Sequence, residues 1–384
     1  MYQTSLDPRH DKATLFVLLL PLVFLLSGTL LRYLAFRYQI PDADPSAYFR
    51  ALCRWDCPWY VSMAERGYDR FPVPSHINAG NWAFFPSYPM LVGLLGKLIP
   101  LPTIVLASLL SLLTAYAAVI VAWPLLGRSR RAYVLYAAFI LSGPLSFYFT
   151  TFFTEVAYVL LTTMVFRFLG RSDYLGAAAA TALLSATRIV GVFAAISIGV
   201  QAMMDYRRDT GSWRGIVGGL LGQPKLVLAI FIAPLGLFAY MAFLHYWIGD
   251  GLAFSHVQRA WGRQVANPFL YLWQGLTTPP WPGQWINPSQ VLALAALAGL
   301  GLTGVLAWRR QWPAVVFALL VILIPLAAGL ASMLRFMAAM APLTITLMTI
   351  LAKNRIIFAL SLAAMLAGAF FTTLAWLGGN VALV

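Results

Sequence analysis

The chain contains twelve acidic residues, and any carboxylate chemistry must come from this small set. Those beside arginine-rich segments have an ordinary explanation as solvated surface charge; the others are Asp42, Asp44, Asp56, Glu65, Asp69, Glu155 and Asp250. Asp56 lies between the bulky Trp55 and the turn-forming Pro58. A carboxylate that is partly desolvated and held in direction can take a proton from an attacking hydroxyl group, so Asp56 is the candidate general base. The alternative is that Asp56 only pairs with Arg54 or caps a surface helix.

Basic residues that could bind an anion occur in two settings. Arg188 and Arg335 stand within apolar sequence, where an unpaired guanidinium is costly, and the planar guanidinium fork suits a phosphate group. Snorkelling of these side chains to the membrane surface is the alternative. A second group recurs at spacings of three and four residues, which a short helix would align on one side; it comprises His256, Arg259 and Arg263. A solvated or headgroup-facing stripe explains that second group equally well.

Metal chemistry is not indicated by the sequence. Two cysteines, Cys53 and Cys57, and four scattered histidines are too few for a site built on Cys or His. Asp42 and Asp44 form an Asp-x-Asp pair of the kind that can hold a divalent cation, but the flanking prolines favour a loop turn. The sequence therefore identifies no cofactor with certainty. A divalent metal ion is compatible with the chain but is not indicated by it.

The two cysteines pose a separate question. On an oxidising face of a membrane a disulfide between Cys53 and Cys57 is allowed. Two residues four apart on a helix have poor geometry for that bond. We therefore expect two free buried thiols.

The elements that must position these side chains are membrane helices. Hydrophobic residues make up 61% of the 384-residue chain and charged residues only 10%, with a mean hydropathy of +0.79, which excludes a soluble globular domain. Apolar segments fall at about 14–34, 84–99, 104–126, 132–148, 152–169, 174–203, 226–247, 290–308, 313–330, 336–351 and 356–377. We predict an all-α polytopic membrane protein with about ten or eleven membrane helices, forming one integral domain over residues 1–384.

The positive charge predicts the topology. The net charge of +14 is concentrated in short arginine-rich loops, which in a membrane protein mark the cytoplasmic side and argue against nucleic-acid binding. Keeping these loops on one side, with the N-terminus cytoplasmic, requires that 84–99 re-enter without crossing and that 174–203 be a broken pair near Arg188 and Gly191. The rival threading makes 84–99 a span and 174–203 one long helix, but it breaks the positive-inside rule. In both threadings two long loops, 35–83 and 248–289, face outward.

Short motifs in order along the chain carry a family resemblance. The motifs are Arg54-Trp55-Asp56, Glu65-Arg66-Gly67-Tyr68 and Ala83-Phe84-Phe85-Pro86-Ser87-Tyr88-Pro89, followed by Phe152-Phe153-Thr154-Glu155, Ala186-Thr187-Arg188-Ile189-Val190-Gly191, Ala253-Phe254 with Trp261-Gly262-Arg263, and Arg335-Phe336. This arrangement resembles the PIG-V-like (GPI mannosyltransferase II-like) family of GT-C membrane glycosyltransferases. The chain departs from the family pattern at Phe153, Val156 and Phe336, where tyrosine, serine and tyrosine are usual. These departures bear on the sugar and the acceptor more than on the class.

The resemblance implies an inverting, GT-C-like glycosyltransferase, expected to be a mannosyltransferase in glycolipid biosynthesis. It would move a sugar from a polyprenyl-phosphate donor to a lipid-linked or glycolipid acceptor at the outer or lumenal face, and we expect a bacterial inner membrane. Asp56 would be the base, and Arg188, Arg335, His256, Arg259 and Arg263 would bind the donor phosphate. The residues expected to position substrates are Arg54, Trp55, Trp59, Tyr60, Glu65, Phe85, Tyr88, Glu155 and Trp261.

Two other classes remain open. A lipid-linked-sugar flippase or a small-solute transporter would use Arg188, Glu155 and the broken 174–203 segment as pathway residues. A transporter of this kind should also carry inverted repeats, and none is found in the sequence. A purely structural membrane subunit would tolerate replacement of Asp56 without consequence.

Overall fold

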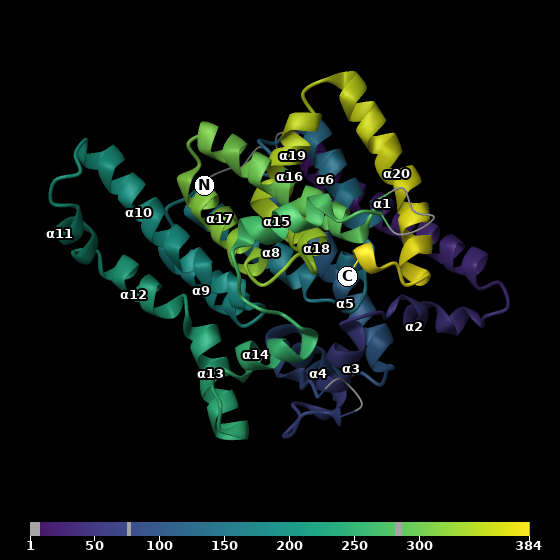
Figure 1. The fold of residues 1–384 in the computed structure, drawn as a ribbon. Coiled ribbons are helices and arrows are strands. Elements are labelled where there is room, and N and C mark those ends of the chain that lie inside the picture. Colours follow the sequence, from purple (N-terminus) through teal and green to yellow (C-terminus); the bar gives the residue numbers. More distant parts are fainter. Residues whose placement is uncertain (1–7, 75–77, 281–285, 384) are drawn as a thin grey trace.

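The computed structural model describes residues 8–74, 78–280 and 286–383, with side chains described from residue 13 onward (Figure 1). Its regular elements are helices, and the described residues contain no strand beyond one isolated bridge between Val73 and Ala79. Short pieces of the two long loops, 75–77 and 281–285, lie outside the described residues. An all-helical membrane protein, as the composition predicts, is thus the architecture of the chain.

Six helical segments among the described residues are long and apolar enough to cross a membrane. They are Ala13–Gln39 within α1 (Pro8–Gln39), α5 (Thr103–Ala122), Ile189–Thr210 comprising η4 (Ile189–Phe193) and α10 (Ala194–Thr210), Pro224–Ile248 comprising α12 (Pro224–Ile232) and α13 (Leu235–Ile248), α16 (Pro288–Trp308) and α20 (Arg355–Leu377). A seventh span results if α18 (Met333–Ala339) and α19 (Ala341–Leu351), which meet at an angle of 71°, are counted together.

The expectation of ten or eleven membrane helices is therefore too high by length. Several apolar segments fold into helices shorter than the roughly 20 residues that a span requires. These shorter helices are α4 (Ser87–Gly96), α6 (Arg130–Ser142), α8 (Glu155–Leu169), α9 (Tyr174–Ser185) and α17 (Trp312–Leu326). Because a helix that is buried on all sides is also apolar all round, composition alone does not separate it from a span.

Of the two topological expectations, the break within 174–203 is borne out, whereas re-entry of 84–99 stays a prediction. The 84–99 segment contains only the ten-residue α4, which is shorter than a full span. The 174–203 segment is broken: α9 ends at Ser185, Arg188 is extended, and η4 begins at Ile189. The remaining short elements lie between the long helices, and they are η1 (Pro45–Ala47), α2 (Tyr48–Leu52), α3 (Cys57–Arg66), η3 (Asn81–Ala83), α7 (Phe147–Thr150), α11 (Ile216–Leu221), α14 (Ala253–His256), η5 (Val257–Trp261), α15 (Pro268–Thr277) and η6 (Val381–Leu383).

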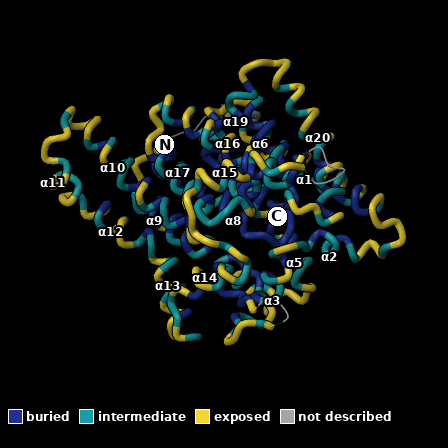
Figure 2. The backbone as a smooth tube through the Cα atoms, in the orientation of Figure 1, coloured by how far each residue is buried: buried dark blue, intermediate teal, exposed yellow. Residues whose placement is uncertain are grey.

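The core is centred on α6 and α8, and the long helices lie around it (Figure 2). α8 packs against α5, α9, α18 and α19, whereas α1 and α20 cover α6. The outer helices expose large apolar side chains, such as Leu26 on α1 and Leu360 on α20, at 68% and 65%. Such apolar faces are suited to lipid, because a soluble protein rarely leaves extensive apolar surface in water.

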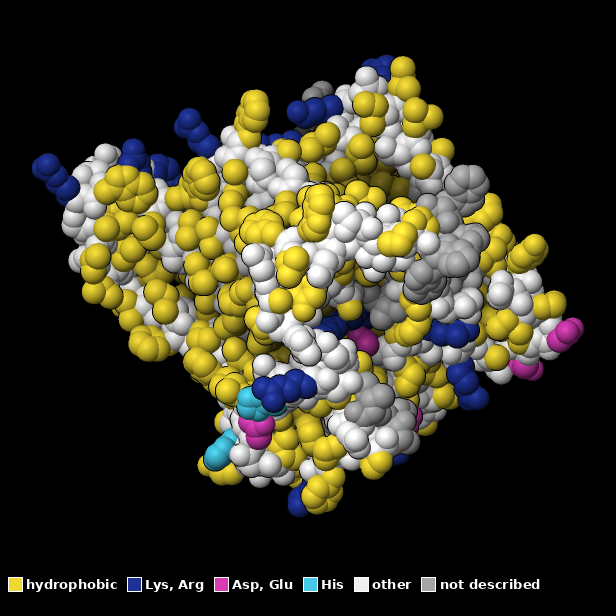
Figure 3. All heavy atoms as spheres, viewed as in Figure 1, with side chains coloured by type: hydrophobic (Ala, Val, Ile, Leu, Met, Phe, Trp, Pro, Cys, Tyr) yellow, Lys and Arg dark blue, Asp and Glu magenta, His cyan; other side chains and the backbone are white. Residues whose placement is uncertain are grey.

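The arginine-rich loops meet at one end of the helix bundle, which we call the basic end. Arg130 lies over the ring of Phe16 near the start of α1, Arg131 donates to the carbonyl of Ala352, and Arg309 donates to Thr349. In Figure 3 several Lys and Arg side chains follow the upper edge of the molecule, whereas the acidic side chains visible in that view lie in the lower half, together with other basic ones. The loops that the positive-inside argument groups together are therefore neighbours in space.

The two long loops meet at the opposite end, which we call the site end. The ring nitrogen of Trp247, at the end of α13, donates to the carbonyl of Tyr68 at 3.1 Å. The hydroxyl of Tyr240 on α13 donates to the carbonyl of Trp82 at 2.7 Å. The rings of Trp59 and Trp261 are 6.1 Å apart between centroids. The described parts of segments 35–83 and 248–289 thus meet at Trp59 and Trp261, and α13 packs against the first of them.

Candidate functional site

Asp56 lies in a tight turn that is closed by a disulfide. α2 ends at Leu52 and α3 begins at Cys57, so Cys53 and Cys57 lie on either side of the turn rather than on one helix. Trp55 takes a left-handed backbone conformation with φ of 57°, which brings the two Cα atoms to 5.2 Å. The expectation of two free thiols was wrong, because it assumed continuous helical spacing that this turn interrupts.

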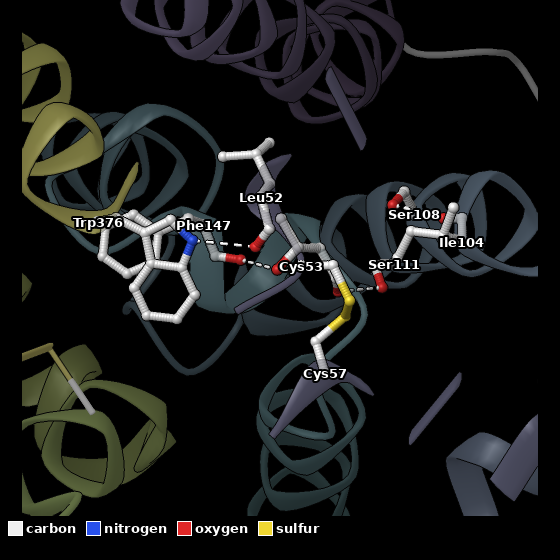
Figure 4. The surroundings of a disulfide bond; sticks show 9 residues. Leu52, Cys53, Cys57, Ile104, Ser108, Ser111, Phe147 and Trp376 are labelled. Carbon is white, nitrogen blue, oxygen red and sulfur yellow. Dashed lines mark hydrogen bonds between the residues drawn. A yellow bond between two sulfur atoms is a disulfide. The ribbon is translucent and has the colours of Figure 1, made fainter. Parts of the chain in front are cut away.

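Other contacts anchor the same turn to the end of α20. The indole nitrogen of Trp376 donates to the carbonyl of Leu52 at 3.0 Å, and Arg54 donates to the carbonyl of Leu377. Figure 4 shows the Trp376 contact beside the disulfide, with the ring of Phe147 close by. That ring stacks on Trp376 at 4.5 Å between centroids. The N-terminal side of the turn that carries Asp56 is therefore anchored to α20.

The Asp56 carboxylate is held through one of its oxygens. Arg335 Nη1 donates to Asp56 Oδ2 at 2.6 Å, and Arg335 Nη2 donates to the hydroxyl of Ser332 at 3.0 Å. Asp56 Oδ1 makes no hydrogen bond within the described residues, and the side chain remains 24% exposed. One oxygen is thus fixed in direction while the other can accept a proton from outside the protein.

Glu155 is the buried centre of the charge cluster. Its side chain is fully buried at the start of α8, and its Oε1 atom lies 2.9 Å from Arg335 Nε and 3.1 Å from Arg188 Nη2. The Oε1 contacts are ion pairs without aligned hydrogen bonds, and Oε2 has no hydrogen-bond partner in the part of the chain that the structure describes. Asp56, Arg335, Glu155 and Arg188 therefore form a chain of alternating charge, in which each buried carboxylate or guanidinium has an opposite neighbour.

Arg188 occupies the break between α9 and η4. Its backbone is extended, with φ of −156° and ψ of 143°, which turns the side chain out of the helical path. The guanidinium pairs with Glu155 and lies over the ring of Phe336 at 4.7 Å. The ion pair with Glu155 therefore ties α8 to the α9–η4 break.

Arg263 differs from the other arginines of the site because it has no carboxylate partner. Its guanidinium makes no hydrogen bond or ion pair among the described residues, although the side chain is half-buried. Burial lowers the pKa of Arg263, while the nearby charge of Asp56 acts in the opposite direction. The positive charges of Arg335 and Arg188 also lower it. Arg263 is thus a partly desolvated cation that lies in the electrostatic field of Asp56 with its donors unused.

The predicted alignment of the second basic group does not occur. α14 runs into η5, and η5 ends at Trp261. Gly262 then takes a left-handed conformation with φ of 68°, so Arg263 lies beyond the helical turns and is not aligned with His256 and Arg259. His256 instead contacts Asp250 at 2.7 Å on the exposed surface, where the hydrogen bond lowers the pKa of Asp250. Arg259 is exposed. Only Arg263 of this group lies in the charge cluster.

Aromatic side chains line the contact between the two loops. Trp59 stacks on Phe84 at 5.7 Å and meets Trp261 edge-on. The hydroxyl of Tyr60 lies 3.2 Å from that of Thr154, next to Glu155, so Tyr60 belongs to the cluster's immediate surroundings. Trp59 and Tyr60 thus connect the Asp56 loop to aromatic surface from the second long loop and to the surroundings of Glu155.

Other residues that were predicted to position substrates serve different contacts. Phe85 and Tyr88 are buried in packing, Phe85 against Tyr240 and Tyr88 through a hydrogen bond with Ser111. Trp55 is 36% exposed at the turn. Glu65 is exposed, with no side-chain contact among the described residues. Sequence reasoning missed Ser332 and Trp376, and no motif in the sequence points to either.

The Asp-x-Asp pair is a loop feature. The side chain of Asp44 accepts a hydrogen bond from the backbone N–H of Ser46 at 2.7 Å and caps η1. This hydrogen bond lowers the pKa of Asp44. Within the described residues, no group of three or more His, Cys, Asp and Glu side chains is arranged to hold a metal ion.

Comparison of the chain with family models, with curated proteins and with solved structures finds no match. The chemistry of the site must therefore be argued from its own geometry. It offers a fixed carboxylate with one open oxygen, an unpaired guanidinium nearby, and aromatic walls. Figure 3 shows basic and acidic side chains together in a hollow near the middle of one face.

Proposed function

We propose that the protein is an inverting membrane glycosyltransferase of the GT-C class that takes a sugar from a polyprenyl-phosphate carrier. The proposal rests on two neighbouring groups of opposite charge. Asp56 is held by Arg335 with its Oδ1 atom open, and Arg263, which has no carboxylate partner among the described residues, lies in the electrostatic field of Asp56. An inverting transfer needs one base for the acceptor and a cation for the departing phosphate. The resemblance to the PIG-V-like family supports mannose as the sugar and a lipid-linked or glycolipid acceptor, at the outer face of a bacterial inner membrane.

In the proposed reaction, Asp56 Oδ1 takes the proton of an acceptor hydroxyl group. The hydroxyl oxygen forms the new bond to the anomeric carbon as the bond from that carbon to the phosphate oxygen breaks. The electron pair of the broken bond leaves with the polyprenyl phosphate, whose negative charge Arg263 stabilises. The configuration at the anomeric carbon inverts because attack and departure occur on opposite faces.

The buried charges have a supporting part in this proposal. Arg335 and Arg188 already have carboxylate partners, so they orient Asp56 and Glu155, and Arg263 becomes the first candidate for the donor phosphate. An apolar groove of about 170 Å³ adjoins α18, the helix that carries Arg335, and is lined by Leu334, Met337 and residues of α16 and α19. A groove of this composition fits part of a polyprenyl chain.

The test is transfer of labelled mannose from polyprenyl-phosphate-mannose to host lipids by purified protein. Asp56→Asn should reduce transfer by about 10²–10⁴-fold, the range for loss of a general base, while donor binding persists. Glu65→Gln is the matched control, because Glu65 is an exposed carboxylate on the same loop outside the cluster. Equal activity of wild type and Asp56→Asn would refute the assignment of the base.

A flippase or transporter is the second candidate, and the broken α9–η4 segment with buried Arg188 and Glu155 favours it. This function predicts that fluorescent polyprenyl-phosphate lipid crosses a vesicle membrane that contains the protein, and that Asp56→Asn has no special effect. Flipping without labelled product in the transfer assay would favour this candidate over the transferase.

A further inference from the structure

The basic end contains a cavity that takes no part in the proposed transfer. It has a volume of about 350 Å³, within the range of small-ligand pockets, and it lies between the ends of α8, α10, α17 and α19. Its floor includes Ala341 and Pro342, where α19 begins. Asp56 and Arg263 are not among its lining residues.

The lining of this cavity is divided between apolar and polar groups. Leu125, Phe166 and Ile345 give apolar surface, whereas Arg309, Arg310 and Thr349 are polar residues at the ends of α16 and α19. A purely apolar occupant would leave the guanidiniums without an anion, and a free anion would leave the apolar walls unfilled. An amphiphile with an anionic head satisfies both parts.

The charges near the opening favour an anion. Arg309 donates only to the hydroxyl of Thr349, at 3.3 Å, and Arg310 is exposed, so both retain unused donors. The lining residue Gln201 donates to Asp205, a carboxylate that also accepts from Ser172 and Tyr174 and pairs with Arg208. The positive charge of Arg309 and Arg310 is therefore not neutralised by a carboxylate in the described structure.

Two tryptophans place the opening at the level of lipid headgroups. Trp308, directly before Arg309, is 90% exposed, and Trp312, directly after Gln311, is 45% exposed. Exposed tryptophans at the ends of apolar helices are typical of the interface between membrane and water. A phosphate at this depth belongs to a membrane lipid.

We propose that this cavity binds one anionic phospholipid, with its phosphate on Arg309 and Arg310 and part of an acyl chain between α8 and α19. The site is distinct from the proposed transfer site, and it does not depend on the transferase assignment. The binding adds no bond-making step. Its energy comes from charge-assisted hydrogen bonds to the phosphate and from burial of acyl methylene groups.

The test uses purified, delipidated full-length protein in a neutral detergent and counts bound lipids by native mass spectrometry. Phosphatidylglycerol and phosphatidylcholine with the same acyl chains are titrated separately. We expect one phosphatidylglycerol to bind at least about tenfold more tightly than phosphatidylcholine, a difference of about 1.4 kcal/mol. Equal affinities would overturn the proposal.

Three variants localise the binding. Arg309→Gln with Arg310→Gln should abolish the preference, whereas Lys353→Gln with Arg355→Gln, which removes the same charge from exposed residues at this end outside the lining, should retain it. Ala314→Phe fills the cavity from α17 without changing charge and should also remove tight binding. Unfolding temperatures without lipid show whether each variant is folded.

Two results would contradict the site. If both double variants weaken binding equally, the lipid responds to general surface charge and not to the cavity. If glycerol 3-phosphate alone displaces the lipid at similar concentrations, the ligand is a free phosphate and the apolar lining has no part.

Discussion

The two ends of the helix bundle differ in whether their arginines are paired with carboxylates. At the site end Arg188 and Arg335 are paired with Glu155 and Asp56, within ion-pair distances of 2.6–3.1 Å. At the basic end Arg131 and Arg167 donate to backbone carbonyls. Among the described residues of this end, the ion pairs involve Arg208 only. Pairing fixes side chains in direction, whereas unpaired charge remains available to anions. The paired charges of the site end therefore fix the orientation of side chains, whereas the unpaired charges of the basic end can attract anions.

The strongest test of this comparison removes one guanidinium from each end. Arg335→Met leaves the Asp56 carboxylate without its partner and leaves buried Glu155 paired with Arg188 alone, so the free energy of unfolding should fall by about 3–5 kcal/mol. Arg355→Met removes an exposed charge at the basic end and should change it by less than about 1 kcal/mol. Unfolding in detergent, monitored by circular dichroism, measures both. Similar losses would mean that the two ends do not differ in this way.

The sequence predicts the parts of the molecule that depend on local pattern. The order of apolar segments, the break near Arg188 and the grouping of the basic loops all follow from hydropathy and charge, and the structure contains them. The number of spans does not follow, because α8 is apolar through burial in protein and is too short to be a span.

The site's long-range contacts are less predictable. Arg335 lies 180 residues beyond Glu155, and nothing local in the sequence indicates that they meet. The Cys53–Cys57 bond was missed because the left-handed Trp55 cannot be recognised from spacing. Arg263 was grouped with His256 by helical periodicity, which Gly262 interrupts. In each case tertiary packing or a backbone turn overrides the local pattern.

The disulfide tests whether orientation at the site end matters for transfer. Cys53→Ala with Cys57→Ala should lower the free energy of unfolding by about 2 kcal/mol, the value for a loop of this length in the chain-entropy model. It should also lower kcat by about tenfold while the donor KM stays constant, because Asp56 loses its fixed direction. Trp376→Phe removes another contact to the same turn and serves as a comparison. A loss of stability with unchanged kcat would reduce the disulfide to a structural role.

Arg263 is the exception at the site end, and its variant sharpens the comparison. Arg263→Gln should raise the donor KM by about tenfold or more, because a charge-assisted hydrogen bond to phosphate contributes about 1.5–3 kcal/mol. Arg259→Gln, a change at an exposed residue in the same loop, should leave the KM near that of wild type. Steady-state transfer at varied donor concentration gives both values. An equal rise for the two variants would assign the effect to loop charge in general.

The smallest expected effect concerns the exposed pair at the site end, Asp250 and His256. The hydrogen bond from His256 lowers the pKa of Asp250 in the folded protein, so its stabilisation is present at neutral pH and is lost as the pH falls through that lowered pKa, from about pH 4 downward. Because both side chains are exposed, Asp250→Asn should cost less than about 1 kcal/mol at pH 7 and nothing at pH 2. Unfolding temperatures across this range, with Asp42→Asn as the exposed control, measure the difference. A larger loss at low pH than at pH 7 would reverse the sign and show that Asp250 is not stabilised as a carboxylate.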